Sequence, residues 1–357
     1  MSTNVPGVNY DNVRRWFAAH IQGGDCELSF QLIGDGRSNI TYLVTGNGQT
    51  WVMRRPPLGH VLPTAHDMAR EFTVQSAVAK AGFPAPKMFA LCEDTSVNDY
   101  PFYVMGFKDG VIITAGLPEG FATTTADRVA MSQALVDTMV QLHAIDYAAV
   151  GLAGFAHKPE GYLERQVRRW SEQWERSKTR EIPEIDELIR RLRAAIPPSP
   201  PATIVHGDYR LGNMILNRED PGKVEAVLDW EMSTLGDPIS DLGYTLVYWG
   251  NSGDDEMRRR ARPMAAVTAQ EGFWTREQII AEYGRQTGRD VSHVDFYEVF
   301  ANYKLAVITE GIYNRFMQGK TTFGDGAGTM ADSAKNLIDL ALSQADASPN
   351  PKLRGQF

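Results

Sequence analysis

Residue types that can carry out chemistry gather in two short segments of this 357-residue chain. The first is His206–Asn213, which holds a carboxylate, a guanidinium and an amide, and the second is Val227–Glu231, which contains two carboxylates. Short aliphatic runs bounded by polar turns are typical of strands, so we expect these polar groups to project from strand ends. Asp208, Asn213 and Asp229 offer the hard oxygen atoms that Mg²⁺ prefers. The two segments therefore predict a magnesium site.

The spacing of these residues matches the catalytic loop of kinases, in which His-x-Asp is followed by an Asn and then by a metal-binding Asp on the next hairpin. Here the loop begins His206-Gly207-Asp208, and the chain continues with Asp229-Trp230-Glu231 and with Gly236–Leu242. In these motifs the chain resembles the aminoglycoside phosphotransferase and choline kinase-like superfamily. More narrowly, it resembles the kinase-like domains that animals fuse to acyl-CoA dehydrogenases.

The resemblance implies a role for each polar residue of the loop. Asp208 would accept or orient the proton of an acceptor hydroxyl, and Asn213 and Asp229 would hold magnesium. His206 would fix the loop by hydrogen bonding, and Asp241 on the following helix would brace its backbone.

Two further charged residues lie close to these positions in the sequence. Arg210 follows Asp208 by two residues, where protein kinases carry a lysine that contacts the transferred group, so we assign Arg210 to the γ-phosphate. Glu231 follows Asp229 by two residues, and it either supports the metal ligands from outside or simply orients the loop.

Two strand-like runs, 28–33 and 40–44, flank a loop that contains two glycines. Glycine lets the backbone approach an anion closely, so amides can face phosphate, although an ordinary hairpin turn also fits this pattern. The Ser-Asn-x-Thr-Tyr sequence at its end is similar to the nucleotide loop of the superfamily. This similarity implies phosphate contacts from Gly34, Gly36, Ser38 and Asn39. The chain contains no GxxxxGK[ST] motif, which argues against a Walker-type ATPase.

The next predicted strand ends in two adjacent arginines, Arg54 and Arg55. In the superfamily this strand carries the cation, usually lysine, that holds the α- and β-phosphates. Side chains alternate along a strand, so only one arginine can face the nucleotide, and alignment with the family favours Arg54. Arginine can clamp phosphate bidentately but does not replace lysine like for like. Glu71, in a predicted helix at 65–81, is either the acid that pairs with this cation or a solvated carboxylate.

The resemblance also implies the fold class, an α+β bilobal protein-kinase-like fold. We expect a small N-terminal lobe with an antiparallel sheet and a larger, mainly helical C-terminal lobe. The lobes are placed at 1–108 and 109–357, with residues 1–25 as an added N-terminal helix. The strand at 101–107 enters the hinge, where the backbone near Met105 and Phe107 is expected to contact adenine.

Helical periodicity continues through the C-terminal lobe. It predicts helices at 126–143, 161–178, 275–287, 294–317 and 329–345. His143, at the end of the first of these, is expected to be a hydrogen-bonded core residue. The segment 251–262 is expected to be exposed, and the proline-containing segment from residue 348 is expected to start a loose tail.

Composition excludes several classes of function. The formal net charge of −8 disfavours nucleic acid as a partner, because phosphate binding requires clustered Lys and Arg. No apolar run reaches the ~18–20 residues that span a membrane, and the polar start of the chain is no signal peptide. The cysteines Cys26 and Cys92 form no CxxC motif or His cluster, which argues against a disulfide framework or a structural zinc. We therefore expect a cytoplasmic protein with no nucleic-acid or membrane partner.

Together, these features predict transfer of the γ-phosphoryl group of ATP, with Mg²⁺, to the hydroxyl of a small molecule. Three acceptor classes stay open. An aminoglycoside would need carboxylates lining the cleft, and a hydroxy acid or hydroxyacyl thioester could use Arg168 or Arg169. Choline or ethanolamine would need an aromatic cage, for which Trp249, Trp274 and Tyr313 are available. A catalytically weak nucleotide-binding pseudokinase or scaffold is the alternative, disfavoured because the loop residues are all competent.

Overall fold

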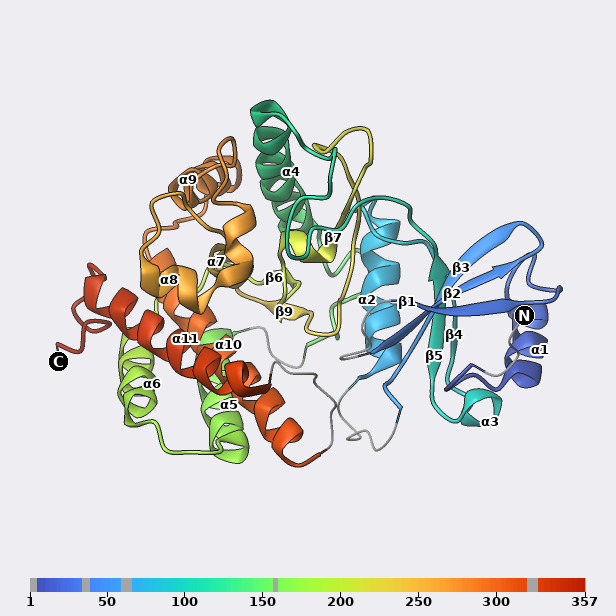
Figure 1. Cartoon of the computed structure of the whole chain (residues 1–357), viewed down its shortest axis with the longest axis horizontal. Helices are drawn as coiled ribbons and strands as arrows, with labels where there is room; N and C mark the ends of the chain where they lie inside the picture. Colours follow the sequence, from blue (N-terminus) through green and yellow to red (C-terminus); the bar gives the residue numbers. More distant parts are fainter. Residues whose placement is uncertain (1–4, 34–38, 59–65, 157–159, 320–326, 357) are drawn as a thin grey trace.

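The computed structural model describes residues 5–33, 39–58, 66–156, 160–319 and 327–356. An N-terminal region built around a sheet lies beside a larger region built mainly of helices (Figure 1). This arrangement confirms the predicted α+β, bilobal fold class. The chain leaves the sheet at Gly106, and Val111 already pairs with Leu216 of the helical region.

The N-terminal region holds a five-stranded antiparallel sheet with the strand order β1-β2-β3-β5-β4. Its strands are β1 Ser29–Ile33, β2 Ile40–Gly46, β3 Gln49–Arg55, β4 Met88–Cys92 and β5 Phe102–Gly106. Its helices are α1 Tyr10–His20, α2 Met68–Lys80 and the short α3 Thr95–Asn98.

Alternation of side chains along the strands gives this sheet two apolar faces. On one face, Trp51 and Met53 of β3 pack in a cluster with Phe17 of α1. On the other face, Val52 of the same strand packs with Met68 of α2. The two helices therefore cover opposite faces, and α2 lies on the side toward the helical region (Figure 1).

Arg55, the last residue of β3, fastens the segment before α1 to the sheet. Its side chain is only 2% exposed, and its guanidinium donates to the Gly7 carbonyl and lies 5.3 Å from the centre of the Tyr100 ring. The hydroxyl of Tyr42 donates to the neighbouring Pro6 carbonyl. The segment that precedes α1 is thus an integral part of the sheet region.

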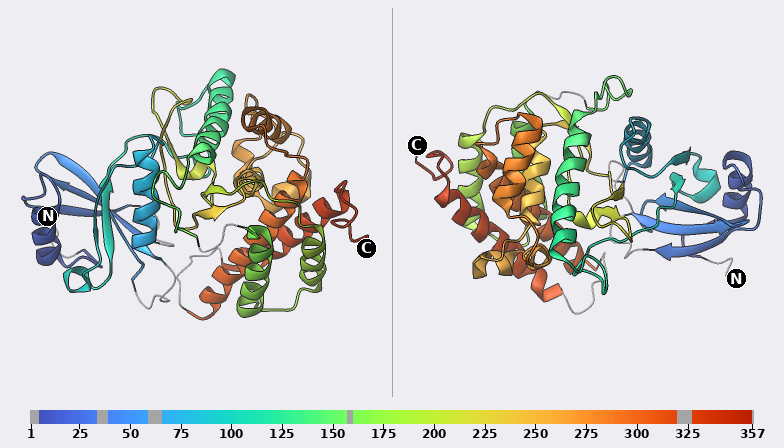
Figure 2. Two further views of the ribbon diagram at one scale, coloured as in Figure 1. Left: turned by 180° about the vertical axis from the view of Figure 1, so that it is seen from behind. Right: turned by 90° about the horizontal axis from the view of Figure 1, so that it is seen from above.

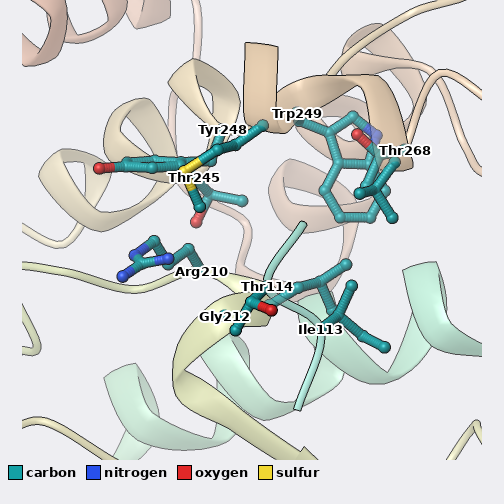
Figure 3. A pocket seen from close by; sticks show the side chains of 11 residues that line it. Ile113, Thr114, Arg210, Gly212, Thr245, Tyr248, Trp249 and Thr268 are labelled. Carbon is teal, nitrogen blue, oxygen red and sulfur yellow. The ribbon is translucent and has the colours of Figure 1, made fainter. Parts of the chain in front are cut away.

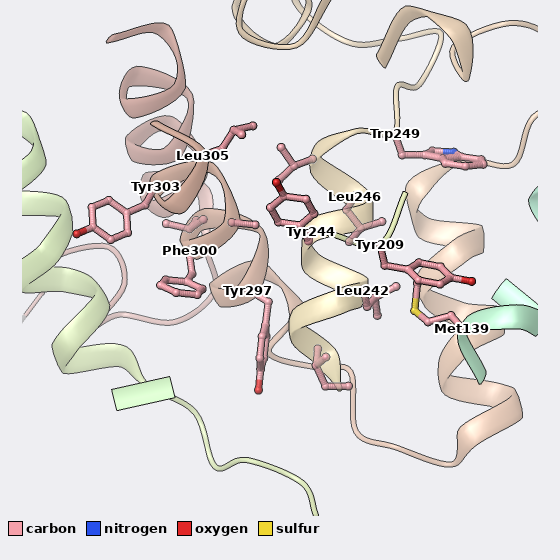
Figure 4. Close-up of a cluster of buried hydrophobic side chains, with 14 of the residues drawn as sticks. Met139, Tyr209, Leu242, Tyr244, Leu246, Trp249, Tyr297, Phe300, Tyr303 and Leu305 are labelled. Carbon is pink, nitrogen blue, oxygen red and sulfur yellow. The ribbon is translucent and has the colours of Figure 1, made fainter. Parts of the chain in front are cut away.

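Helices make up most of the C-terminal region. They are α4 Thr125–Ala144, α5 Tyr162–Ser177, α6 Pro183–Ala195, α7 Ile239–Val247, α8 Glu256–Ala261, α9 Arg276–Thr287, α10 Val294–Met317 and α11 Ala327–Ala347, with the 3₁₀ helix η2 Pro263–Val267. Helix α10 is central, because it contacts α5, α6, α7 and α11, and Figure 2 shows α10 and α11 side by side in orange and red. Aromatic side chains fill the space between α7 and α10, including Tyr244 and Phe300 (Figure 4). Among the described residues, no helix combines the length and the apolar character that a membrane crossing requires.

Two small antiparallel pairs of strands carry the polar segments singled out in the sequence. Strand β6 Thr203–Val205 pairs with β9 Thr234–Gly236, and β7 Met214–Leu216 pairs with β8 Val224–Val227. The short 3₁₀ helix η1 Leu211–Asn213 precedes β7. The first polar segment therefore joins β6 to β7, and the second joins β8 to β9.

Of two further expectations for this region, one is confirmed in part and the other is wrong. The segment 251–262 is exposed at positions such as Ser252 and Asp255, but Asp254 forms a close ion pair with Arg276 and Arg262 is only 9% exposed. The segment from Ser348 is not loose, because Ser348 is buried and accepts a hydrogen bond from Arg354 at its carbonyl, while Leu353 is fully buried. In both places charged or polar residues are fixed by partners that are distant in sequence or that lie in an irregular turn.

Candidate active site

The turn that presents Asp208 needs glycine at position 207. Gly207 has a φ of +84°, and a Cβ atom there would lie 2.5 Å from the Met232 carbonyl oxygen. His206 fixes the same turn, because its Nε2 lies 2.9 Å from the Leu228 carbonyl and its Nδ1 lies 3.2 Å from the Asp208 backbone nitrogen. A carbonyl can only accept and a backbone N–H can only donate, so His206 carries its proton on Nε2. The ring thereby connects the two polar segments.

Asp241 of α7 holds the backbone of this turn by hydrogen bonds. Its carboxylate accepts from the backbone nitrogens of His206 and Gly207 at 2.7 and 2.8 Å, and it also contacts Nε2 of His143 at 3.1 Å. Burial acts to raise the pKa of Asp241, but the hydrogen bonds and the two histidines outweigh it and hold the pKa below its usual value. His143 is a buried, hydrogen-bonded core residue, as expected, and its Nδ1 contacts the Tyr283 hydroxyl.

Lys304 of α10 holds the turn from another side, and the sequence analysis missed it. Its ammonium donates to the Gly207 carbonyl at 2.7 Å and lies 4.5 Å from the centre of the Tyr244 ring. Burial lowers the pKa of Lys304 to about 8, although Asp208 and Asp241 act in the opposite direction. The signal that could have found it is a single lysine inside the long apolar stretch of the predicted helix 294–317.

The Asp208 carboxylate is held at both oxygens. Arg210 Nε donates to Oδ1 at 3.2 Å, and the Asn213 amide donates to Oδ2 at 2.7 Å and to the Asp208 carbonyl at 2.8 Å. Its side chain is 19% exposed, so one edge still faces solvent. Asp208 is therefore oriented by the loop and open to a substrate.

Arg210 packs against the loop and lines a pocket. A Cβ atom at Gly212 would lie 2.3 Å from Arg210 Nη1, so the glycine makes room for the guanidinium. The guanidinium also lies 4.9 Å from the centre of the Tyr248 ring. Beyond it, Thr114 and Thr245 face the same hollow (Figure 3). Arg210 thus separates this pocket from Asp208.

Arg54 of β3 faces the carboxylates of the cleft, whereas Arg55 faces the N-terminal segment. Arg54 Nη2 donates to Asp229 Oδ1 at 2.6 Å, and its Nε lies 3.2 Å from Glu71 Oε1. Asp229 has a φ of +67°, a left-handed backbone that is uncommon outside glycine and often found at functional sites. The structure therefore brings the strand cation, the helix acid and the second Asp into one cluster.

The acids of this cluster are crowded. Glu71 is 2% exposed, and burial raises its pKa although Arg54 acts to lower it. Burial, followed by the charge of Asp229, raises the pKa of Glu231 to about 8, again against Arg54. Burial is thus the main cause of both raised pKa values, and the nearby carboxylate of Asp229 adds to it.

Asn39 links two of these acids. Its amide nitrogen lies 3.3 Å from both Glu71 Oε2 and Glu231 Oε2, and its amide oxygen accepts from His66 Nδ1 at 2.8 Å. Here the side chain of Asn39 contacts carboxylates. His66 is a second residue that the sequence analysis missed, and it has a φ of +61°.

The cluster suits a magnesium ion. Asn213 uses its amide nitrogen on Asp208, which directs its oxygen elsewhere, and Asp229 uses one carboxylate oxygen on Arg54. Within the described ranges, no group of three His, Cys, Asp or Glu residues could hold a metal by itself. Mg²⁺ commonly takes one or two protein ligands and completes its shell with phosphates and water, and the oxygen atoms of Asn213 and Asp229 that these contacts do not use are ligands of the right kind.

The other residues selected from the sequence fall in different places. Gly34, Gly36 and Ser38 lie outside the described residues. Met105 is 7% exposed on the α2 face of the sheet, whereas Phe107, just after β5, is 44% exposed.

Residues considered for the acceptor are also separated. Arg168 is exposed and pairs with Glu172 at 3.9 Å. Trp249 is buried, and its indole nitrogen donates to the Trp274 carbonyl at 2.7 Å. These contacts are those of a surface ion pair and a core residue.

Comparisons with known proteins identify a family for this chain. The phosphotransferase enzyme family matches residues 29–270. Acyl-CoA dehydrogenase family member 11 from Gallus gallus is 34% identical over 321 residues, which is 88% of this chain and 40% of that protein. This chain therefore spans less than half the length of that relative.

Two solved structures are also similar. A protein from Ralstonia eutropha, described as a candidate aminoglycoside phosphotransferase, is 32% identical with a TM-score of 0.77, covering 94% of this chain and 98% of that one. A mutant aminoglycoside phosphotransferase in a ternary complex with ADP and hygromycin B is 12% identical with a TM-score of 0.58, covering 91% and 97% of the two chains. The second comparison shows a shared fold.

Proposed function

Because the chain belongs to the phosphotransferase enzyme family, we propose that it transfers the γ-phosphoryl group of ATP, in the presence of Mg²⁺, to the hydroxyl of a small acceptor molecule. The resemblance recognised in the sequence, including that to the domains fused to acyl-CoA dehydrogenases, is confirmed by the comparisons. The observation that carries the proposal is a chain of contacts: Asn213 holds Asp208, its carbonyl pairs with the backbone of Leu228 next to Asp229, and Asp229 pairs with Arg54.

Asn213 and Asp229 are the residues that would hold Mg²⁺, which when bound offsets the negative charge of the transferred group. Arg54, which forms an ion pair with Glu71, would contact the phosphates, and the backbone near Met105 and Phe107 would contact the adenine. The ADP complex of the structural neighbour supports the use of a nucleotide.

Asp208 accepts or orients the proton of the acceptor hydroxyl. Arg210 and Asn213 fix its two oxygens, which leaves the remaining lone pairs to face the substrate. Positioning of this kind supplies most of the rate enhancement in phosphoryl transfer, where the protein performs little covalent chemistry.

Three elements contribute a cation near the turn that carries Asp208, namely Lys304 of α10, Arg169 of α5 and Arg70 of α2. The charge of Arg169 acts to lower the pKa of Lys304 and of Arg70, after the larger effect of burial and against Asp208 and Asp241 at Lys304 and Asp67 at Arg70. Lys304 donates to the Gly207 carbonyl and Arg70 to the carbonyls of Phe155 and Ser233, whereas Arg169 is exposed. A cationic aminoglycoside would need carboxylates here, so the charges favour an anionic acceptor such as a hydroxy acid or hydroxyacyl thioester.

The test is transfer of labelled γ-phosphate from ATP to a panel of acceptors. The panel contains hydroxy acids and their coenzyme A thioesters, aminoglycosides, choline and ethanolamine, and Asp208→Asn is the control protein. We expect label on hydroxy acids or their thioesters that is lost in the control. Label on aminoglycosides would show that the acceptor class is wrong. Tight binding of ATP and magnesium with no transfer to water or to any acceptor would favour a pseudokinase.

A further inference from the structure

The peptide group between Gly207 and Asp208 is fixed at both ends by side chains. Its carbonyl accepts from the Lys304 ammonium at 2.7 Å, and its N–H donates to His206 Nδ1 at 3.2 Å. The preceding N–H, that of Gly207, donates to Asp241 at 2.8 Å. Two consecutive peptide groups therefore lie between a buried cation and a buried anion. This plane sets the direction in which the Asp208 side chain leaves the backbone.

A buried lysine at position 304 lowers the stability of the fold. Its residue is 9% exposed, it lies on the central helix α10, and it faces the rings of Tyr244 and Trp170 at 4.5 and 5.7 Å. Burying an ammonium costs free energy unless it is paired, and cation–π contacts recover only part of that cost. A methionine of similar length would fill the same space without this cost. A role in function explains why a cation lies here.

We propose that Lys304 is a positioning residue for Asp208, and that its ammonium orients the catalytic carboxylate by holding the carbonyl of the peptide that precedes it. The proposal rests on the proposed function, in which Asp208 is the group that acts on the acceptor hydroxyl. No described contact joins Lys304 to the Asp208 carboxylate, so it acts through the backbone.

The charged groups that face Lys304 come from three elements. Asp208, in the turn after β6, and Asp241, on α7, favour the protonated form, whereas Arg169, on α5, disfavours it. Burial is the largest influence and brings the pKa to about 8. A neutral amine donates a weaker hydrogen bond than an ammonium, so turnover is expected to fall as the pH rises through this value.

The experiment compares Lys304→Met with wild type and with the control Lys335→Met. Lys335 lies on α11 and pairs with Asp339 and Glu184, away from the turn. Magnesium-dependent hydrolysis of ATP, with water in place of the acceptor, reports turnover without knowledge of the acceptor. Binding of ATP with magnesium and the melting temperature are measured in parallel.

We expect Lys304→Met to lose about 10²-fold in kcat, because a displacement of about 1 Å at the reacting group has an effect of this size. ATP affinity stays close to wild type, the melting temperature does not fall, and the decline above pH 8 disappears. Lys335→Met behaves as wild type. Normal turnover in Lys304→Met overturns the proposal.

Crystal structures of the wild type and of Lys304→Met test the positioning role of Lys304 without an activity assay. A rotated Gly207–Asp208 peptide and a displaced Asp208 carboxylate support the proposal, and an unchanged turn overturns it. If the variant melts too low to crystallise, the same comparison with Lys304→Arg, which keeps the charge but moves the donor, replaces it. A wild-type protein that neither hydrolyses ATP nor transfers phosphate contradicts the proposed function, and the structures still decide the role of Lys304 in the turn.

Discussion

The two halves of the candidate site, the turn around Asp208 and the cluster around Arg54, differ in how their charged groups are paired. In the turn that carries Asp208, opposite charges alternate, and Asp241, Lys304 and Arg210 each meet a partner within the protein. In the cluster around Arg54, acids outnumber the cation, and Glu231 has a pKa of about 8. The charged groups of the turn have partners without a ligand, whereas in the cluster burial and neighbouring carboxylates hold Glu231 in its neutral form at neutral pH. One part of the site thus has a fixed geometry, and the other gathers several carboxyl groups around one cation.

The largest expected effect tests the turn around Asp208. Asp208→Ala should lower turnover by about 10²–10⁴, the range expected for loss of a general base. ATP affinity should change little, because Asp208 does not belong to the Arg54 cluster. Single-turnover transfer and equilibrium binding of ATP with magnesium measure the two quantities. A variant that keeps its turnover would show that the carefully held carboxylate has no part in the chemistry.

A stability comparison separates the two halves next. Asp241→Ala removes the acceptor of two backbone N–H groups and a buried histidine, so the free energy of unfolding should fall by about 3–5 kcal/mol. Glu231→Gln should change it by less than about 1 kcal/mol at neutral pH, because its raised pKa already favours the protonated form that an amide resembles. Chemical denaturation measures both. Equal losses of unfolding free energy in the two variants would contradict the difference between the Asp208 turn and the Arg54 cluster.

The pH dependence of stability isolates Lys304. Its pKa is about 8 in the folded protein and 10.5 ordinarily, so between these values the unfolded chain binds more protons. The free energy of unfolding therefore rises with pH in this window, by up to about 3 kcal/mol from this group. Lys304→Met should lack this rise, which denaturation of both proteins from pH 7.5 to 10 would reveal. Parallel curves for the two proteins would contradict the burial of the ammonium.

The smallest effect tests the Arg54 cluster. Arg54→Met leaves Glu71 and Asp229 without their shared cation, so Mg²⁺ alone should bind more tightly than to wild type. A tenfold gain in affinity adds about 1.4 kcal/mol of stability at saturating ion, visible as a larger rise in melting temperature on adding MgCl₂. An identical rise in both proteins would mean that the cluster does not attract cations.

The parts of this site that the sequence predicted are those whose residues lie close together in the chain. The loop from His206 to Asn213 and the later Asp241 form a short-range pattern, and the fold class follows from the family that uses this pattern. Lys304 could not be placed, because its partner Gly207 lies 97 residues away and a lysine in a helix ordinarily points to solvent.

Other errors have the same origin. Arg54 was expected to pair with Glu71, but its second partner Asp229, 175 residues away, was not foreseen. The segment 251–262 is exposed in part, as expected, but ion pairs with later helices hold its Asp254 and Arg258. The sequence shows which residues are polar, but only the fold determines which polar groups come into contact.

The neighbours Arg54 and Arg55 give β3 a consequence for protein engineering. Arg54 grips the acids of the cleft, while Arg55, one residue further on the same strand, is clamped to the segment before α1. Residues 5–9 are therefore coupled to Arg54 through its neighbour Arg55. An affinity tag, a graft or a truncation that displaces residues 5–9 removes the partner of Arg55, and the resulting shift at the end of β3 also moves Arg54. Fusions to this protein are best joined elsewhere.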